Sequence, residues 1–467
     1  MISSTSTDAF ESYYTLFDQT FSAENLRKIT ETEQRKGSNP SLDFFPSVLR
    51  ATEELKDRIR DTKAFRAAHK RKYTAAEQIT FDALREARET ARKARDQELL
   101  DRLRDVSDNI SNARFQVDLQ QGIGPNNKPI YLLPPGSAEC FYAVKQISRN
   151  IERIYKVKQA NRNRIVSQLQ DLLNDGFPYH IIRLDVKNFY ESIEHRGLIK
   201  KLRSDQLLSA TSISVLEKIL WKYGSLAGTP GLGLPRGVGI SAALSELYMR
   251  QFDRAVRIMP EVTFFARYVD DIVVVFAPCS DSKRSQYRDK IIAQLDDLGL
   301  KENPLKKDES PPERRGWDLT YLGYKFSFHS NTSCKTVLSD QKFTRYQDRL
   351  KACFTRYHSQ RAKNAKKAYR LLVKRIQYLT GNTQLTHSKS NAFVGIYFSS
   401  PHLTDLKQLR NLDGQLRGLI AGVSHSPTLQ AKLSNYSFQN GYEERSFRRF
   451  HKPGQFEEIT KAWNYGR

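Results

Sequence analysis

Cysteine is scarce in this chain, and two kinds of apolar segment are missing. The 467 residues include four cysteines, and no two of them have CxxC spacing. This excludes a disulfide scaffold and a paired-cysteine zinc site. No run of about 18 apolar residues occurs, and the N-terminus lacks a basic start followed by an apolar run, so we expect neither a membrane helix nor a secretory signal. The expectation is a cytoplasmic protein with no membrane partner. The cysteines are Cys140, Cys279, Cys334 and Cys353.

Acidic residues are outnumbered by basic ones. The chain has 52 Asp and Glu against 76 Lys and Arg, a formal net charge of +24. Residues 341–467 hold 23 bases and 7 acids, so this last quarter carries +16. Lys and Arg side chains neutralise phosphates, and the interleaved aromatic side chains can stack on unpaired nucleobases. The pattern therefore favours a nucleic acid partner. Tyr346, Leu350, Phe354 and Tyr357 also recur at helical spacing, which indicates a helix with an aromatic core stripe. The two interpretations are compatible.

Glycine and proline mark the organisation of the chain. Neither occurs from Ser47 to Gln121, where charges of both signs alternate, and this predicts long helices with a thin apolar stripe. Residues 122–135 predict a hairpin-like segment, and residues 177–328 mix β-branched runs with helical stretches. The predicted domains are a helical N-terminal extension (1–120), a mixed region (121–335) and a basic helical region (336–467). Whether the N-terminal helices pack on the rest of the protein or pair with another chain stays open, and we favour the first.

The strongest local signal is the segment from Phe264 to Phe276, in which two apolar β-prone runs flank Val269, Asp270 and Asp271. The pattern predicts a hairpin, although its turn lacks the Asn-Gly or Gly-X sequence that short hairpins prefer. Acidic residues also avoid strands, so a segment that breaks local rules at its centre is a candidate functional site. Adjacent carboxylates repel unless a cation lies near, and Mg²⁺ prefers oxygen ligands. The alternative is an exposed turn with two solvated acids.

A second acidic position strengthens the first. The segment from His180 to Tyr190 predicts a strand with Asp185 in or at the end of its apolar run. A carboxylate on a buried strand needs a charged partner. If this strand and the Asp270–Asp271 hairpin share a sheet, three carboxylates point at one place. Three carboxylates around two metal ions, about 3.5–4 Å apart, form the site used for in-line phosphoryl transfer.

A glycine-rich stretch, Gly231 to Ser241, lies between these two acidic segments. It precedes a predicted helix, for which Ser241 is a candidate N-cap. Such a loop can approach a nucleotide closely with its backbone, but an ordinary flexible loop would have the same composition.

Taken in order, these segments resemble the motifs of reverse transcriptases. The motifs are Asp185 within LDVKNFYESI, the loop GLPRGVGIS, Tyr268-Val269-Asp270-Asp271, Asn303-Pro304-Leu305-Lys306 and Tyr321-Leu322-Gly323-Tyr324. The resemblance covers about residues 120–330. It implies an α+β right-hand polymerase fold, with fingers, a palm whose antiparallel sheet carries the acids, and a helical thumb, preceded here by the helical extension.

The resemblance also implies roles for single residues. Asp185, Asp270 and Asp271, with Val186 beside them, would hold two Mg²⁺ ions as cofactors. Lys306 matches a lysine that is a candidate general acid for pyrophosphate, with its neighbour Lys307 as a competitor. Leu322 and Gly323 match the turn that supports the primer end.

Further residues are implied to contact the nucleoside triphosphate or the template. Tyr190 occupies the position at which an aromatic ring excludes a 2′-hydroxyl, although it can also be a core aromatic beside Phe189. Arg236, Gly237 and Ser241 would lie near the template and the incoming nucleotide. The residues that the resemblance implies for substrate binding are therefore Tyr190, Arg236, Gly237, Ser241 and Tyr268. For Arg162, contact with the triphosphate and an ordinary surface position both stay open.

Two positions depart from the family pattern, since Arg236 replaces the usual Gln and Ala242 the usual Pro. The continuation SAALSELYM and a C-terminal segment, residues 395–416, are similar to bacterial defence-associated enzymes of the abortive-infection and "unknown group" lineage. The first functional hypothesis is therefore an RNA-directed DNA polymerase that makes cDNA from a dedicated noncoding RNA and deoxynucleoside triphosphates in antiviral defence. The alternatives are a template-independent, protein-primed DNA synthetase and a catalytically silent RNA-binding protein. Homo-oligomerisation stays open.

Overall fold

The computed structural model describes residues 17–124, 127–278, 283–330, 333–385, 392–423, 426–449 and 454–463, so Cys279 lies outside the described residues. The chain divides into two compact units. Unit 1 comprises Met1–Gly122, Pro129–Lys158 and Glu194–Leu244, and unit 2 comprises Ile123–Lys128, Gln159–Ile193 and Ser245–Arg467. Within the described residues, no helix has the length and apolar character needed to cross a bilayer.

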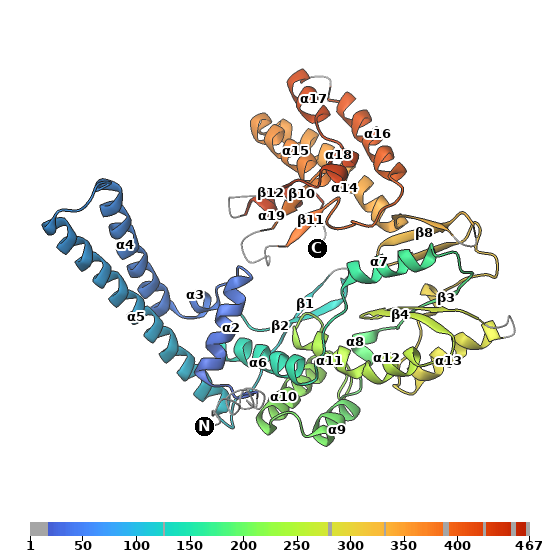
Figure 1. Ribbon diagram of the computed structural model, residues 1–467, viewed down its shortest axis with the longest axis horizontal. Coiled ribbons are helices and arrows are strands. Elements are labelled where there is room, and N and C mark those ends of the chain that lie inside the picture. Colours follow the sequence, from blue (N-terminus) through green and yellow to red (C-terminus); the bar gives the residue numbers. More distant parts are fainter. Residues whose placement is uncertain are drawn as a thin grey trace, which may run out of the picture. The chain divides into compact units, whose positions relative to one another are not determined.

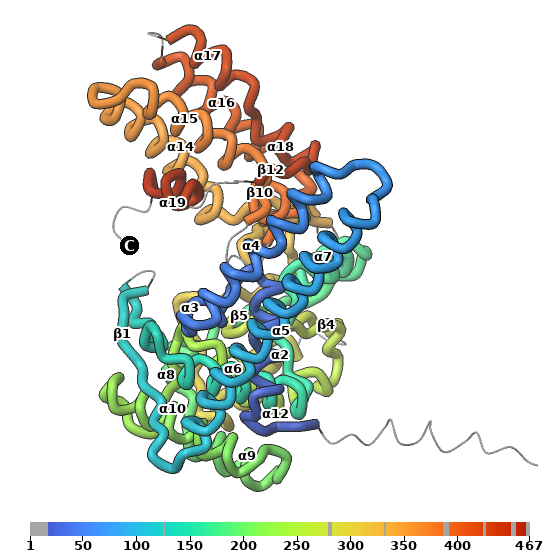
Figure 2. The backbone as a smooth tube through the Cα atoms, turned by 90° about the vertical axis from the view of Figure 1, so that its left-hand side faces the viewer, coloured from blue at the N-terminus to red at the C-terminus, as the bar shows by residue number. Residues whose placement is uncertain are grey.

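Unit 1 contains a long helical hairpin made of α4 (Pro46–Ala68) and α5 (Ala75–Ser111). Figures 1 and 2 show the two helices running side by side. Thr74 and Glu77 form a reciprocal capping box at the start of α5, which supplies partners for backbone N–H groups that the helix leaves unpaired. Stacked rings of Phe65 and Phe81 close the hairpin near its turn. The long helices predicted for this region are therefore present, with a break between residues 69 and 74.

In the rest of unit 1, α2 and α10 pack against α6, whose apolar residues recur at helical spacing. The Tyr142 hydroxyl lies 2.7 Å from Thr30 Oγ and joins α6 to α2. The predicted hairpin is present as the two-stranded sheet of β1 and β2. The elements are α2 (Ala23–Arg35), α3 (Pro40–Phe44), β1 (Gln120–Ile123), β2 (Pro129–Leu132), α6 (Ala138–Ile154), α9 (His195–Asp205) and α10 (Ala210–Ala227).

Unit 2 is built on a four-stranded sheet with the order β4-β5-β3-β6, in which every pairing is antiparallel. Helices cover its central strands, and β5 is a continuous apolar run that is buried from Ile272 to Phe276 (Figure 1). The elements are α7 (Arg162–Leu173), β3 (His180–Asp185), α8 (Phe189–Ser192), α12 (Arg250–Arg257), β4 (Val262–Tyr268), β5 (Asp271–Phe276), α13 (Arg284–Asp296), the 3-10 helix η3 (Pro304–Lys306) and β6 (Asp308–Glu309).

A second antiparallel sheet follows, formed by β7 (Asp318–Tyr321), β8 (Tyr324–Phe328) and β9 (Cys334–Leu338). Leu322 and Gly323 connect β7 to β8, and both have positive φ angles, 47° and 73°. This is the mirrored two-residue turn whose twist suits a tight hairpin. Side chains of β7 and β8 share one apolar core with α7 and β5.

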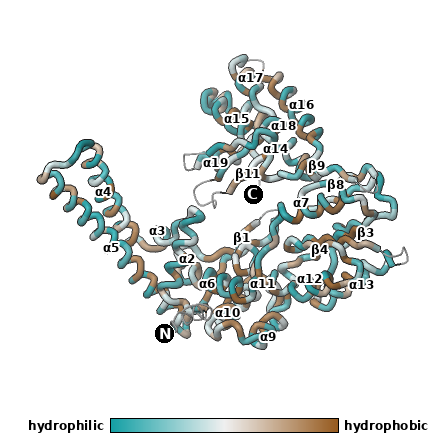
Figure 3. The backbone as a smooth tube through the Cα atoms, in the orientation of Figure 1, coloured by the Kyte–Doolittle hydropathy of each residue, from teal (hydrophilic) through white to brown (hydrophobic). Residues whose placement is uncertain are grey.

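The C-terminal part of unit 2 is a helical bundle with a small sheet, β11-β10-β12. Figure 3 shows apolar and polar stretches alternating along its helices. Inward-facing residues such as Leu372, Leu416 and Phe438 form its core. The elements are α14 (Asp340–Arg361), α15 (Ala365–Thr380), β10 (Asn382–Gln384), β11 (Phe393–Gly395), α16 (Lys407–Ala421), α17 (Pro427–Ser434), α18 (Phe438–Glu444), β12 (Phe447–Arg449) and α19 (Gln455–Thr460).

Candidate active site

The turn between β4 and β5 carries two of the three predicted acids. Tyr268 and Asp271 are partners in the ladder, so Val269 and Asp270 form a two-residue turn. Val269 has a φ of 61°, a conformation that β-branched residues strongly avoid. Such strain costs about 1–3 kcal/mol and persists only where the surroundings enforce it.

A buried ion network enforces this turn. The Arg267 guanidinium donates to both carboxylate oxygens of Asp253, at 2.7 and 2.8 Å, and to both of Glu246, at 2.8 and 3.3 Å. A further N–H of Arg267 donates to the Val269 carbonyl at 3.0 Å. The two acids raise the pKa of Arg267 against the effect of its burial, so the arginine stays charged. One cation therefore holds two helices, α11 (Ile240–Tyr248) and α12, and the strained turn together.

The third predicted acid lies directly beside this turn. Asp185, the last residue of β3, is the ladder partner of Asp271. The Val186 N–H donates to the Asp270 carbonyl at 3.0 Å, which extends the pairing past the ladder. Asp185 and Asp271, which are 86 positions apart in the chain, thus meet at one edge of the sheet, as the sequence predicted.

Both carboxylate oxygens of the buried Asp185 are occupied by residues of the segment that follows α13. Asn303 Nδ2 donates to Oδ1 at 2.9 Å, and Lys306 Nζ donates to Oδ2 at 2.9 Å. The Asn303 N–H also donates to the Asp185 carbonyl at 2.7 Å. Of the two candidate lysines, Lys306 is therefore the one that contacts an acid of the site.

Asp271 is held by Arg183, two residues before Asp185 on β3. Arg183 Nε donates to Asp271 Oδ1 at 2.9 Å, and its Nη1 donates to Asp308 Oδ2 at 3.0 Å. Burial, together with the charges of Asp185 and Asp270, raises the pKa of Asp271 to about 6, against the opposing effect of Arg183. The three carboxylates therefore lie close enough to repel one another.

The donor set of the three acids suits a divalent cation in its chemistry. Three carboxylates supply only oxygen ligands, and their mutual repulsion would be relieved by a hard cation, so the chemistry of the donors fits such an ion. Among the residues that the structure describes, however, no group of three or more His, Cys, Asp or Glu side chains is arranged to hold a metal. The carboxylates of Asp185 and Asp271 are instead paired with Lys306 and Arg183.

Two predicted substrate residues also belong to unit 2. Tyr190 lies on α8, the single helical turn that follows Asp185, and is half-buried against the ring of Phe189, 5.5 Å away. Asn188 has a positive φ of 47° and begins this turn. Tyr268 is half-buried at the end of β4 and packs on the unit 2 core.

The other predicted substrate residues, Arg236, Gly237 and Ser241, belong to unit 1. The Arg236 carbonyl accepts from the Tyr131 N–H at 2.7 Å, and a Cβ on Gly237 would lie 2.8 Å from the Tyr131 carbonyl, so this position excludes side chains. The prediction of Ser241 as an N-cap is wrong, because α11 begins at Ile240. Ser241 Oγ instead donates to the Pro235 carbonyl at 2.8 Å and closes the loop.

Arg162 contacts the turn between β7 and β8. Its Nε donates to the Leu322 carbonyl at 3.0 Å, and its Nη1 donates to the Ser399 carbonyl at 3.3 Å. Lys342 Nζ donates to the same Ser399 carbonyl at 2.7 Å. The sequence left two roles open for Arg162, contact with the triphosphate and a surface position. Neither role anticipated this contact with a turn 160 residues later in the chain.

Four residues that shape the site were missed from the sequence: Arg183, Asn303, Glu246 and Asp253. Arg183 carried a usable signal, since a lone charge in an apolar strand needs a charged partner. Asn303 was noticed as part of a motif, but its bond to Asp185 was not. The partners of Arg267 come from two helices, and no local pattern indicates that pairing.

The comparison with known families agrees with this geometry. Residues 140–326 match the family described as "Reverse transcriptase (RNA-dependent DNA polymerase)". This segment is thus a reverse transcriptase domain, which is a nucleotidyltransferase of the RNA-directed DNA polymerase class. The predicted enzyme class and the α+β polymerase fold are confirmed. No curated protein matches the chain.

Several solved structures are similar to this chain at low identity. Apo telomerase from Candida tropicalis is 14% identical, with a TM-score of 0.39, over 75% of this chain and 62% of that chain. Telomerase from Candida albicans in complex with a fragment of telomeric RNA is 11% identical, with a TM-score of 0.36, over 69% and 64%. The RNA-dependent RNA polymerase of a human picobirnavirus is 14% identical, with a TM-score of 0.33, over 71% and 65%. The chain spans 55% to 65% of the length of these and a truncated C. tropicalis telomerase. At these scores the likeness transfers no substrate or partner.

Proposed function

We propose that the chain is an RNA-directed DNA polymerase that extends a primer with deoxynucleotides, using Asp185, Asp270 and Asp271 as its catalytic carboxylates. One observation carries the proposal: the ladder pairing of Asp185 with Asp271, extended by the Val186–Asp270 hydrogen bond, brings three acids to one sheet edge inside a reverse transcriptase domain.

The reaction joins the primer 3′-oxygen to the α-phosphorus of a nucleoside triphosphate and releases pyrophosphate. Asp185, Asp270 and Asp271, with Val186 beside them, would hold two Mg²⁺ ions. When bound, Mg²⁺ supplies positive charge that lowers the pKa of the primer hydroxyl and stabilises the leaving pyrophosphate. Lys306 holds a proton at Nζ beside Asp185 and is the proposed donor to that pyrophosphate.

The remaining residues of the chain position these groups. Arg183 fixes the carboxylate of Asp271, and the Arg267 network holds the Val269 turn in its strained conformation. The ring of Tyr190 is proposed to lie under the sugar and exclude a 2′-hydroxyl, which distinguishes deoxynucleotides from ribonucleotides. Tyr268, Arg236, Gly237 and Ser241 are proposed to contact the nucleotide or the template.

The test is primer extension by purified protein with Mg²⁺, deoxynucleoside triphosphates and an RNA template annealed to a DNA primer. Asp270→Asn should lower the rate at least about 100-fold, since the carboxylate stabilises charge that develops in the transition state. Asp318→Asn, an exposed acid on β7, is the matched control and should retain wild-type activity. Equal rates for wild type and Asp270→Asn would refute the assignment.

We further propose that the template is a dedicated noncoding RNA and that the product serves antiviral defence. The support is the similarity of SAALSELYM and of residues 395–416 to defence-associated enzymes. RNA that co-purifies with the chain should include one abundant species complementary to the DNA product. Cells that carry Asp270→Asn should lose protection against phage if synthesis is the defensive step, and normal protection by that variant would favour a silent RNA-binding role.

A template-independent, protein-primed synthesis is the second candidate, favoured by Arg236 and Ala242 in place of the usual Gln and Pro. Sequencing the product separates the two. Complementarity to an RNA supports templated synthesis, and a random or homopolymeric product covalently attached to the protein supports the alternative.

A further inference from the structure

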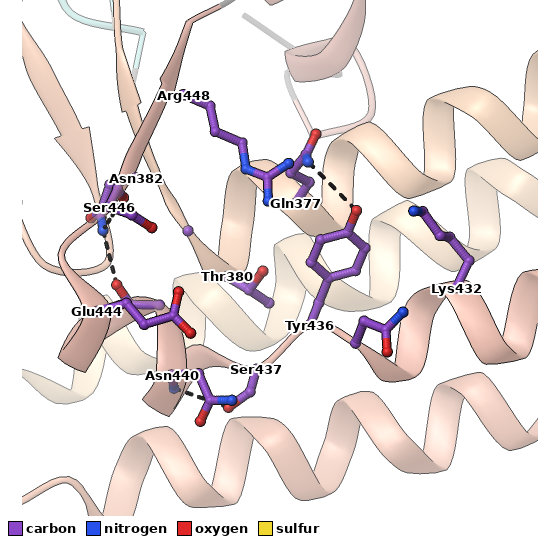
Figure 4. Close-up of a pocket in the computed structure, with 13 residues that line it drawn as sticks. Gln377, Thr380, Asn382, Lys432, Tyr436, Ser437, Asn440, Glu444, Ser446 and Arg448 are labelled. Atoms are coloured by element: carbon purple, nitrogen blue, oxygen red, sulfur yellow. Dashed lines mark hydrogen bonds between the residues drawn. The ribbon is translucent and has the colours of Figure 1, made fainter.

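A polar cavity of about 230 Å³ lies among α15, α17, α18, β10 and β12 (Figure 4). All of its lining residues are polar or glycine, so it differs from the largely apolar pockets that bind drug-like molecules. Its lining includes the carboxamides of Gln377, Asn435 and Asn440, the ring of Tyr436, and two cations, Lys432 and Arg448.

The wall of this cavity is held rigidly by hydrogen bonds. Asn382 Nδ2 donates to the Gly441 carbonyl at 2.9 Å and to the Ser446 carbonyl at 3.2 Å, and its Oδ1 accepts from the Tyr397 N–H at 2.9 Å. Gly441 approaches α15 so closely that a Cβ would overlap the Thr380 carbonyl oxygen. The cavity is therefore a fixed feature of the packing of α15 against α18.

The two cations at the cavity, Lys432 and Arg448, do not stabilise the fold through their charged groups. Within the described part of the chain, neither Lys432 nor Arg448 has an ion-pair or side-chain hydrogen-bond partner, and Glu444 is the one acid in the lining. Figure 4 shows Arg448 extending toward Gln377, with the ring of Tyr436 between Gln377 and Lys432. Arg, Lys, Asn, Gln, Ser and Tyr are the residue types that contact phosphate and sugar oxygens in nucleic acid complexes.

Exposed aromatic rings lie on the other face of the small sheet, opposite to Arg448 of the edge strand β12. Side chains alternate along a strand, so Phe447 and Arg449 face away from Arg448. Phe447 and Phe393 are 43% and 42% exposed, with ring centroids 4.8 Å apart. The Arg449 guanidinium lies 5.9 Å from the Phe447 ring centroid, and its Nε donates to Gln384 Oε1 at 2.6 Å.

These two faces together select a single-stranded ligand. Aromatic side chains stack on bases that are unpaired, whereas a duplex keeps the faces of its bases inside its own stack. The net charge of +16 over residues 341–467 complements a polyanion.

We propose that the β12 edge binds a single strand of nucleic acid, with Lys432 and Arg448 contacting backbone phosphate at the cavity and Phe447 stacking on an unpaired base. The choice of nucleic acid as the ligand rests on the proposed polymerase function. The site would hold a stretch of template or product outside the region where the carboxylates act on the primer end.

The test uses the full-length chain with fluorescein-labelled single-stranded RNA and DNA 20-mers, in EDTA so that no synthesis occurs. Fluorescence anisotropy gives the affinity at several salt concentrations. Arg448→Gln and Lys432→Gln should each reduce the slope of log affinity against log salt by about 0.7, the loss of one phosphate contact on a single strand. Phe447→Ala should weaken binding about 5- to 100-fold without changing that slope. Arg417→Gln on α16 and Trp221→Ala on α10, both exposed, are the matched controls.

Wild-type slopes in both cavity variants, or equal affinities for Phe447→Ala and Trp221→Ala, would overturn the proposal. A larger loss of affinity for RNA than for DNA identifies the bound strand as template. A larger loss of affinity for DNA identifies it as product, and both outcomes support the site. Primer extension keeps this test separate from that of the proposed function. Absent synthesis with the predicted binding defects would refute the polymerase and leave the site standing.

Discussion

The buried cation beneath the β4–β5 turn is the most sharply testable part of the structure. We predict that Arg267→Met destabilises this hairpin, because it removes the guanidinium that pairs with both Asp253 and Glu246. Removing one partner of a buried pair typically costs about 3–5 kcal/mol. The Val269 carbonyl also loses its donor, which raises the free-energy cost toward the upper end of this range. Partial hydration of the two acids lowers the cost.

Hydrogen exchange measured by mass spectrometry on peptides that cover β4 and β5 is the appropriate assay. A chain with two compact units need not unfold in a single step, and exchange reports the opening free energy of the hairpin itself. A loss of about 3 kcal/mol corresponds to roughly 150-fold faster exchange of the protected amides.

The matched control is Arg203→Met, because Arg203 pairs with Glu217 on the surface and such pairs contribute about 0–1 kcal/mol. A triple variant that adds Glu246→Gln and Asp253→Asn to Arg267→Met should recover much of the lost protection, since no uncompensated charge remains. If Arg267→Met changes exchange in β5 no more than Arg203→Met does, the network does not hold the hairpin and the reasoning fails.

Three further predictions concern other side chains of unit 2. Lys306→Met should slow single-turnover primer extension about 100-fold by removing the proposed proton donor, while Lys307→Met stays near wild type, and equal rates for both would contradict the assignment. Tyr190→Ala should raise the incorporation of ribonucleotides relative to deoxynucleotides at least about 10-fold, measured by competing the two triphosphates in one reaction, and an unchanged ratio would return Tyr190 to a packing role. Burial, with the charges of Arg162 and Arg345, lowers the pKa of Lys342 from 10.5 to about 7, so the unfolded chain binds more protons between these values and the stability contributed by this lysine rises as pH increases through 7. Exchange protection of β8 and β9 in wild type relative to Lys342→Met should therefore grow by about 2 kcal/mol from pH 7 to pH 9, and a flat difference would contradict the shift.

Short-range signals in the sequence were sufficient for the sheet edge that carries the acids. Two apolar runs of strand length each placed an acid at one end, and pairing them antiparallel brings those ends together. Asp185 and Asp271 are accordingly ladder partners. The break between α4 and α5 had a local signal too, the Thr74–Glu77 capping box, which was overlooked.

The supporting contacts were not predictable in the same way. Arg267 finds its acids on α11 and α12, and Arg162 finds the Leu322 carbonyl, through the packing of elements that are separate in the chain. Val269 illustrates the consequence. A hairpin turn without glycine looks unfavourable locally, and it becomes tolerable because Arg267 bonds its carbonyl while acids from α11 and α12 hold that arginine in place.

The two cations that face the carboxylates are unequal, and this inequality bears on how the site works. Arg183 is 13% exposed and bridges Asp271 and Asp308, so separating it would leave buried charge uncompensated. Lys306 is 55% exposed and bonds one acid from a 3-10 helix, so its ammonium group is readily hydrated when it leaves, and the buried Asp185 then requires another cation in its place. Asp185 is therefore the carboxylate that can change partner during a reaction, while Asp271 keeps Arg183. In the proposed reaction, Lys306 would then be free to carry its proton from Asp185 to pyrophosphate.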